Sequence, residues 1–343
     1  MKKLYLLCLN ILFVYVSHAQ TIALHQNGDI QLFKGTSAFA QAYEASQNGD
    51  TLYFSGGTFF PPTVLTKELT LFGTGHYPDS TLVTGETFIN GNISLSQGAD
   101  NFYIEGVSIS GKFEITSNES VKSLTIKRCY IENEISIRGN KTNMSSNIDI
   151  IGSVFKGGNF ENVENLFVSN SIIYNGRIVN SYENKFTNNI ILYLDGTSYY
   201  YVFTDCHNNN IFNNIICKAN NYNNYFISGH DNVLRNNVFS HALLNLGTNP
   251  ILSDNIGEVD LEGLFVNQSG VNFDYSHDYH LQDETLYIGH DGKQVGIYGG
   301  IFPYKEGAVP KNPHIMEMNI SDTTTEQGEL PVKIKVSTQK DQD

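Results

Sequence analysis

The segments NKFTNNII (residues 184–191), NNIFNNII (residues 209–216) and NVLRNNVF (residues 232–239) are copies of one motif. Earlier copies, such as the one around Ile148-x-Ile150, carry apolar residues where these three begin with Asn. The motif recurs from Asn101 to Ser240, and one equivalent anchor residue from each copy gives intervals of 22, 24, 18, 18, 25 and 23 residues. The anchors are Gly106, Arg128, Gly152, Asn170, Asn188, Asn213 and Asn236.

This period is typical of a solenoid, because a unit of 18 to 25 residues cannot bury its apolar face alone. The apolar positions alternate with the period of two that a β-strand requires, whereas a helical repeat is longer and has a period of about 3.6. A leucine-rich repeat has a similar length, but here the apolar positions are mostly Ile, Val and Phe, which favour strands. The motif therefore predicts stacked coils of β-strand.

Polar residues occupy a fixed place before each anchor. Coils of a parallel β-helix stack roughly 4.8 Å apart, so equivalent positions form columns. Asn and Asp suit turns, since they tolerate the left-handed backbone conformation, and paired residues such as Asn213-Asn214 predict stacked amides within a turn. The column five residues before the anchors consists of Asn101, Ser123, Asn147, Asn165, Glu183, Asn208 and Asp231.

The Asn-rich coils resemble those of the right-handed parallel β-helix proteins of the pectate-lyase-like superfamily, especially the secreted repeat proteins common in Bacteroidetes. Residues 36–48 have the pattern of a helix, and GDTLYF (49–54), GGTF (56–59) and LTLFGTG (69–75) resemble the N-terminal cap and first coils of that superfamily. Gly263 to Gly300 resembles its closing coil. The resemblance implies an all-β fold: one single-stranded right-handed parallel β-helix, or solenoid, with an N-terminal helical cap.

Three segments are expected. Residues 1–19 have the basic start, short apolar run and small-residue exit of a signal peptide, which predicts export to the extracellular space, the periplasm or the cell envelope. That run is too short to span a membrane. Residues 20–303 form the capped β-helix. Residues 304–343 form a C-terminal extension, in which 329–336 (ELPVKIKV) pairs with 315–320 before a disordered end.

The composition limits the partners. The chain has 35 acidic and 21 basic residues and a formal net charge of −14, which argues against nucleic acid and anionic membranes as partners. After removal of the leader three cysteines are left, namely Cys129, Cys206 and Cys217, and we interpret them as buried thiols. The oligomeric state is left open.

One group of residues is a candidate site. His207 and His230 each lie six residues before an anchor, so they are expected to stack, and Asp205 and Asp231 lie close by in the sequence. Coil insertions add Tyr199, Tyr201, Tyr222 and Tyr225, and Arg235 follows. The four His and Asp residues are the catalytic candidates, and the tyrosines with Arg235 are the ligand-binding candidates. The alternative interpretation is that His and Asp belong to the turn and that the tyrosines cover the coil surface.

Two functions fit this pattern. The first is a secreted or cell-envelope protein that binds an extended polysaccharide or serves as a structural surface, with no cofactor. The second is a polysaccharide lyase or glycoside hydrolase acting on a glycan that contains uronic acid. Two carboxylates can hydrolyse a glycoside. A base beside a metal-held carboxylate can eliminate across a uronic acid, and only this lyase would need Ca²⁺. The catalytic motifs of hydrolases with this fold are missing, so we expect binding.

Overall fold

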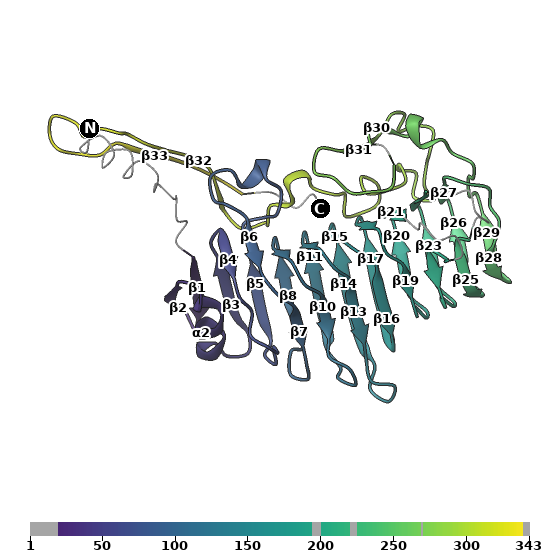
Figure 1. Cartoon of the computed structure of the whole chain (residues 1–343), viewed down its shortest axis with the longest axis horizontal. Coiled ribbons are helices and arrows are strands. Elements are labelled where there is room, and N and C mark those ends of the chain that lie inside the picture. The colour runs from purple at the N-terminus through teal and green to yellow at the C-terminus, as the bar shows by residue number, and fades with distance from the viewer. Residues whose placement is uncertain (1–19, 194–199, 220–224, 269, 339–343) are drawn as a thin grey trace, which may run out of the picture.

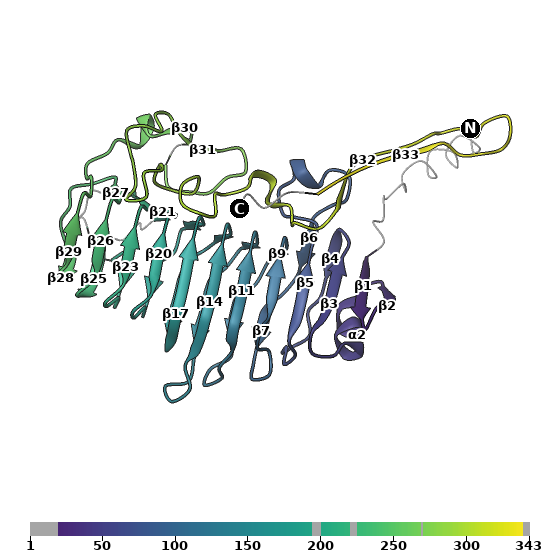
Figure 2. The ribbon, with the colours of Figure 1, turned by 180° about the vertical axis from the view of Figure 1, so that it is seen from behind.

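Three parallel sheets wind into a long solenoid (Figures 1 and 2). The computed structural model describes residues 20–193, 200–219, 225–268 and 270–338. Each coil contributes one strand to sheet 1, then one to sheet 2, then one to sheet 3, and coils stack through parallel pairing. The ends of the solenoid depart from this: β1 pairs antiparallel with β2 and with β3, the coil of β3 and β4 has no strand in sheet 3, and the last coil has only β29. The chain is thus a single right-handed parallel β-helix, as predicted.

The strands of each sheet follow the solenoid axis in order. Sheet 1 contains β2 (Asp29–Lys34), β1 (Thr21–Gln26), β3 (Asp50–Phe54), β5 (Leu69–Phe72), β8 (Tyr103–Glu105), β11 (Lys122–Lys127), β14 (Ser145–Ile151), β17 (Val163–Ser169), β20 (Lys185–Thr187), β23 (Asn210–Phe212), β26 (Val233–Arg235) and β29 (Ile251–Ser253). Sheet 2 contains β4 (Gly57–Phe59), β6 (Thr87–Ile89), β9 (Ser108–Ile109), β12 (Tyr130–Ile131), β15 (Val154–Phe155), β18 (Ile172–Tyr174), β21 (Ile190–Tyr193), β24 (Ile215–Lys218) and β27 (Val238–Phe239). Sheet 3 contains β7 (Ile93–Leu95), β10 (Phe113–Ile115), β13 (Ile135–Arg138), β16 (Gly158–Glu161), β19 (Ile178–Val179), β22 (Phe203–Thr204), β25 (Ile227–His230) and β28 (Leu246–Thr248).

Left-handed residues make the corners before and after sheet 1. All seven anchors have φ between 50° and 72°, and all seven members of the preceding polar column have φ between 54° and 61°. This confirms the predicted turns, because Asn and Gly adopt the left-handed conformation at little cost. The outer column is mostly exposed, so its side chains contribute one inter-coil amide bond, from Asn165 to Asn147 at 3.2 Å.

Continuous amide ladders run inside the corners instead. Asn189 donates to Asn214 at 3.0 Å, Asn214 to Asn237 at 3.0 Å, and Asn237 to Asn255 at 2.9 Å. A second ladder includes the Asn residues that begin the later motif copies, with Asn209 donating to Asn232 at 3.1 Å. All of these asparagines except the partly exposed Asn255 are buried, and they satisfy backbone groups of the neighbouring coil.

A helix covers the N-terminal end of the core. Helix α2 (Ala38–Ala45) buries Ala38, Phe39, Ala42 and Tyr43 against the first coils, as expected of a cap. It is shorter than the predicted 36–48, because Ser37 lies at the N-cap without a side-chain bond and Ser46 is already extended. Within the described chain, no helix has the length and apolar character needed to cross a membrane.

The chain after Ser253 does not form the expected closing coil. Its strands β30 (Phe265–Asn267) and β31 (Asp278–Leu281) pair only with each other, and the chain runs back along the solenoid past η2 (Leu261–Gly263) and η3 (Glu306–Ala308) (Figure 1). We call residues 256–310 the return segment. Its side chains cover the outer face of sheet 2, which is itself apolar. The outer face of sheet 2 is apolar, so covering it removes more apolar surface from water than one further coil at the end would.

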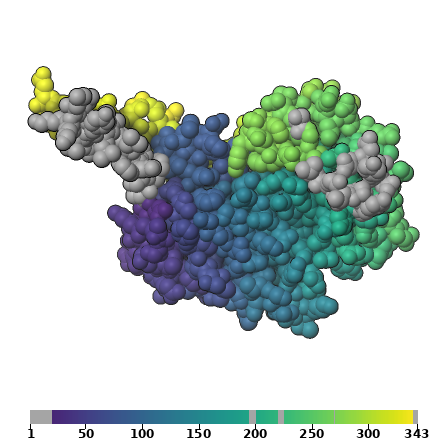
Figure 3. Space-filling model, in the orientation of Figure 1, coloured from purple at the N-terminus to yellow at the C-terminus, as the bar shows by residue number. Residues whose placement is uncertain are grey.

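The described chain ends in a projecting hairpin. Strand β32 (His314–Ile320) pairs antiparallel with β33 (Val332–Ser337), which confirms the predicted pairing. Figures 1 and 2 show this hairpin extending beyond the N-terminal end of the solenoid, and Figure 3 shows the elongated body. The connection from β5 to β6 contains the short helix η1 (Asp79–Thr81), which contacts η3.

Candidate functional site

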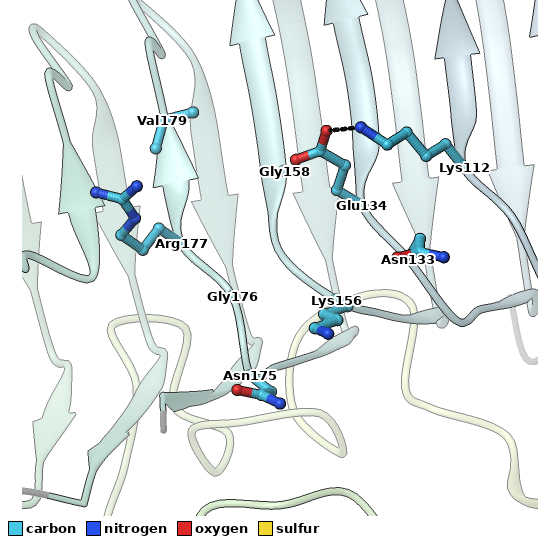
Figure 4. Close-up of a pocket in the computed structure, with 9 residues that line it drawn as sticks. All are labelled: Lys112, Asn133, Glu134, Lys156, Gly158, Asn175, Gly176, Arg177 and Val179. Atoms are coloured by element: carbon cyan, nitrogen blue, oxygen red, sulfur yellow. Dashed lines mark hydrogen bonds and ion pairs between the residues drawn. The ribbon is translucent and has the colours of Figure 1, made fainter. Parts of the chain in front are cut away.

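A cleft opens at the corner between sheets 2 and 3. Its volume is about 350 Å³, and Figure 4 shows its walls. The lining residues all belong to the connections from sheet 2 to sheet 3, or to the strands that follow, in four successive coils. They are Lys112, Asn133, Glu134, Lys156, Gly158, Asn175, Gly176, Arg177 and Val179. The cleft therefore crosses the coils and follows the solenoid axis.

Glycines create the hollow. The residues just before β10, β13, β16 and β19 are Lys112, Glu134, Gly157 and Arg177, so this column lacks a side chain at its third coil. A Cβ on Gly176 would lie 2.8 Å from the Gly157 Cα, which is too close for a real side chain. Gly157 and Gly176 therefore allow their two coils to approach closely. The long side chains of the other lining residues form the walls of the cleft on either side of them.

The cleft is basic on a protein that is strongly acidic. Lys112 Nζ lies 2.5 Å from Glu134 Oε1, and both side chains are partly exposed. Among the described residues, neither Lys156 nor Arg177 has an ion-pair partner. In Figure 4 the Lys112–Glu134 pair stands at one side and Arg177 at the other, with Lys156 between them. The cleft thus has a net positive charge, whereas the chain as a whole has −14.

Tyrosines continue this surface along the axis. The Arg177 guanidinium lies 4.5 Å from the ring centroid of Tyr200, which is 51% exposed. The next pair of rings, Tyr201 and Tyr225, have centroids 4.8 Å apart. We call the cleft and these three tyrosines the corner site. Tyr199 and Tyr222, which were also predicted to bind ligand, lie outside the described residues.

A buried lysine holds the tyrosines in place. Lys218 is only 2% exposed, and its Nζ donates to the carbonyl oxygens of Tyr200 and Tyr225, each at 3.4 Å. The same ammonium lies 5.7 Å from the Tyr225 ring centroid, a cation–π distance. Lys218 thus ties together two chain segments that carry the predicted insertions.

The predicted catalytic group forms in part. His207 and His230 lie one above the other on neighbouring coils, as expected, with ring centroids 4.2 Å apart and ring planes tilted by 44°. His230 Nδ1 lies 2.6 Å from Asp231 Oδ2, with both side chains about half exposed. Asp205 lies nearby, but among the described residues its carboxylate contacts neither histidine. These residues occupy the turn from sheet 3 to sheet 1, outside the cleft.

Arg235 is separated from the tyrosines. It lies in β26 on sheet 1, where its guanidinium is 5.7 Å from the Phe212 ring centroid. The tyrosines lie in the connections from sheet 2 to sheet 3, so the structure does not bring Arg235 to them. Arg235 is therefore not part of the corner site, and its predicted role in ligand binding stays a prediction.

Sequence reasoning missed Lys112, Lys156 and Glu134. Each lies one or two residues before a sheet 3 strand, and those strands are short and carry no shared motif. The signal that could have found them is the Gly-rich spacing in KGGNF (156–160) and NGRIV (175–179), which indicates close backbone approach between coils.

The described residues include no group of three or more His, Cys, Asp or Glu side chains placed to hold a metal ion. Cys129, Cys206 and Cys217 are free and buried, as interpreted. Burial raises the pKa of each thiol to about 12, so these cysteines are poor nucleophiles.

No protein-family model matches the chain, and no curated protein sequence matches it. The fold and the geometry of the corner site are therefore what bears on function.

Proposed function

We propose that this protein binds an extended acidic polysaccharide along the corner site. The observation that carries the proposal is the continuity of Lys156, Arg177 and Tyr200 across successive coils, with the guanidinium stacked on an exposed ring. Cations without acidic partners are suited to carboxylate or sulfate groups, and an exposed tyrosine ring offers an apolar face with a polar tip.

The geometry favours a polymer over a small molecule. Coils repeat at roughly 4.8 Å along the axis, so a chain lying parallel to the axis meets equivalent positions again and again. The cleft is partly open to solvent rather than enclosed. A long ligand can therefore continue from the cleft to the tyrosines, and its affinity is the sum of several weak contacts.

The expected cellular setting agrees with this ligand. We propose that residues 1–19 are a signal peptide and that the mature protein acts outside the cytoplasm, where acidic polysaccharides occur. We also propose membership of the pectate-lyase-like superfamily, in the form found in Bacteroidetes, on the resemblance of the Asn-rich coils.

The test is electrophoresis through gels that contain acidic or neutral polysaccharides. The parent protein should be retarded by at least one acidic polymer, and the retardation should weaken as salt is added. The double variant Lys156→Gln/Arg177→Gln should raise Kd by about tenfold, because two charge-assisted contacts are lost. The matched control is Arg235→Gln, which removes a cation outside the corner site.

Two results would contradict this proposal. One is a parent protein that no acidic polymer retards. The other is an Arg235→Gln variant that weakens binding as much as the double variant does. Far-ultraviolet circular dichroism of each variant confirms that the fold is retained.

A catalytic alternative has one observation in its favour. The contact of 2.6 Å between His230 and Asp231, with His207 stacked beside them, is the arrangement of a general base with an orienting carboxylate. This alternative is a lyase or hydrolase acting on a glycan that contains uronic acid. Incubation with such polymers should then yield unsaturated products or new reducing ends, and Asp231→Asn should abolish them.

A further inference from the structure

The charges of the cleft alternate along the solenoid axis. The residues just before β10, β13 and β16 form one column, in which Lys112 is followed by Glu134 one coil later and by Gly157 on the next coil. Lys156 directly precedes Gly157, so the third coil again contributes a cation to the cleft. Lys112 and Lys156 are therefore two coil steps apart, roughly 10 Å, and Glu134 belongs to the coil between them.

The Glu134 carboxylate is accessible to a ligand in the cleft. Its Oε1 lies 2.5 Å from Lys112 Nζ, and the Glu134 and Lys112 side chains are 35% and 44% exposed. Figure 4 shows the two side chains together on one side of the cleft. An ionised carboxylate accepts hydrogen bonds and donates none. Glu134 is therefore suited to the hydroxyl groups of a neutral sugar, and it repels the carboxylate of an acidic sugar.

Two further carboxylates belong to the same coils but lie outside the cleft. Glu114 Oε1 accepts a hydrogen bond from Ser94 Oγ at 2.8 Å, which directs this carboxylate toward the preceding coil. Glu161 is the last residue of β16 and lies opposite Arg138 of β13, a residue of opposite charge. Of the described residues that line the cleft, Glu134 alone carries a carboxylate.

This order of charges matches a polymer in which acidic and neutral sugars alternate. One sugar unit of an extended polysaccharide is similar in length to one coil step, so alternate sugars fall on alternate coils. Acidic sugars against Lys112 and Lys156 then leave a neutral sugar against Glu134. In a polymer of acidic sugars alone, one carboxylate has to lie against Glu134, where like charges repel.

We propose that Glu134 is a specificity-determining residue, which selects polysaccharides whose acidic sugars alternate with neutral ones. This inference rests on the proposed function, because it concerns the ligand of the same site. A cleft lined by cations alone favours the polymer of highest charge density. The cleft with Glu134 favours an alternating polymer, although that polymer has only half the charge density.

The test compares two polymers of glucuronic acid at equal length and ionic strength. One is a homopolymer, and the other is hyaluronan, in which glucuronic acid alternates with neutral N-acetylglucosamine. Affinity electrophoresis gives a Kd for each polymer. The parent should bind hyaluronan about tenfold more tightly than the homopolymer. The Glu134→Gln variant loses the charge and keeps the size of the side chain. It should bind the homopolymer about tenfold more tightly than the parent does, and hyaluronan about as tightly.

Two further variants separate this role from a structural one. Glu161→Gln is the matched control, because it removes a carboxylate from the same sheet outside the cleft, and the ratio of its two Kd values should equal that of the parent. Lys112→Gln leaves Glu134 without its ion-pair partner. It should weaken binding of the homopolymer more than binding of hyaluronan, and it keeps the test decisive if Glu134→Gln fails to fold.

The outcomes distinguish this inference from the proposed function. A parent that binds the homopolymer as tightly as hyaluronan, or a Glu134→Gln variant with the Kd ratio of the parent, would overturn the inference and leave the proposed function intact. A parent that binds neither of these polymers also overturns the inference. A parent that no acidic polysaccharide retards would remove the proposed function as well.

Discussion

Asparagine has two distinct roles in the corners of this solenoid. At the anchors its backbone adopts a left-handed conformation, as at Asn213 with φ of 57°. One residue later its side chain bonds the neighbouring coil, as at Asn214. Asn214 Oδ1 accepts from the Asn189 backbone at 2.9 Å, and its Nδ2 donates to the Phe186 carbonyl at 2.9 Å. These hydrogen bonds are buried, so each one contributes more to the free energy of unfolding than a hydrogen bond at the surface does.

Replacing Asn214 with Leu should lower the free energy of unfolding by roughly 3 kcal/mol, because the buried Asn189 amide and Phe186 carbonyl lose their partners. The measurement is urea unfolding followed by circular dichroism. The control Asn210→Thr changes an asparagine on the partly exposed outer face of sheet 1 and should have little effect. Equal losses in the two variants would show that the ladder does not stabilise the coils.

His76 should make stability depend on pH. It is fully buried beside Tyr77, Tyr130 and Tyr275, and this burial lowers its pKa from 6.5 to about 3. In the unfolded chain His76 binds a proton as the pH falls through about 6.5. In the folded chain His76 stays neutral until the pH falls to about 3. Unfolding is therefore favoured as pH falls through this window, and above it His76 adds no pH dependence.

The comparison is between the parent and His76→Phe, which cannot titrate. Between about pH 6 and pH 4 the unfolding free energy of the parent should fall faster, by up to about 1.4 kcal/mol per pH unit. Urea titrations at several pH values measure the two slopes. Identical slopes would mean that His76 becomes protonated in the folded protein.

At the scale of elements, the return segment is held by the anchor column. Asn170 Nδ2 donates to the carbonyls of Ile297 and Gly299, each at 2.8 Å, and Asn188 Nδ2 donates to the Gly296 carbonyl at 3.4 Å. Toward the N-terminal end, Arg128 donates to the Val309 carbonyl at 3.4 Å. Residues that shape the turns thus also fasten the cover of sheet 2.

The variant Asn170→Gly isolates this second role, because glycine keeps the left-handed backbone and removes only the side chain. It should destabilise the protein by about 2 kcal/mol and speed proteolysis within residues 256–310, since the buried Gly299 carbonyl loses its Asn170 donor and the Ile297 carbonyl keeps only the Tyr304 backbone N–H. Asn147→Gly is the matched control at an exposed left-handed position, and its effect should be small. If both variants resist protease like the parent, the anchors do not hold the return segment.

For the whole molecule, the two ends should differ in stability. Each coil of a solenoid contacts mainly its neighbours, so an uncovered terminal coil opens first. Amides of β29, beside the open end, should exchange with solvent much faster than amides of β14, which has a coil on either side. Hydrogen exchange on monomeric protein measures this gradient. Slower exchange in β29 than in β14 would contradict it.

The repeat made most of the fold predictable. Left-handed positions such as Asn101 and Asp231 show a fixed spacing from the anchors, so the turns and their stacking follow from the sequence. The return segment was harder to foresee because it has no period. A signal did exist: paired residues such as Ile190-Ile191 indicate a strand that is apolar on both faces, and Ile190 packs against the cover.

The site was less predictable than the fold. Stacking of His207 on His230 follows from register, whereas the approach of Arg177 to Tyr200 depends on how the connections between sheets 2 and 3 fold. Those connections vary in length and share no motif. Their side chains could therefore be placed only once the coils had been built.

The most direct test of the proposed function is a map of amide protection when an acidic polysaccharide binds. Hydrogen exchange with and without the polymer locates the bound surface. We predict slower exchange at residues 112–113, 156–158 and 175–178, which border the cleft. Protection confined to the turn around His207 and His230, or no protection at all under saturating polymer, would contradict the account.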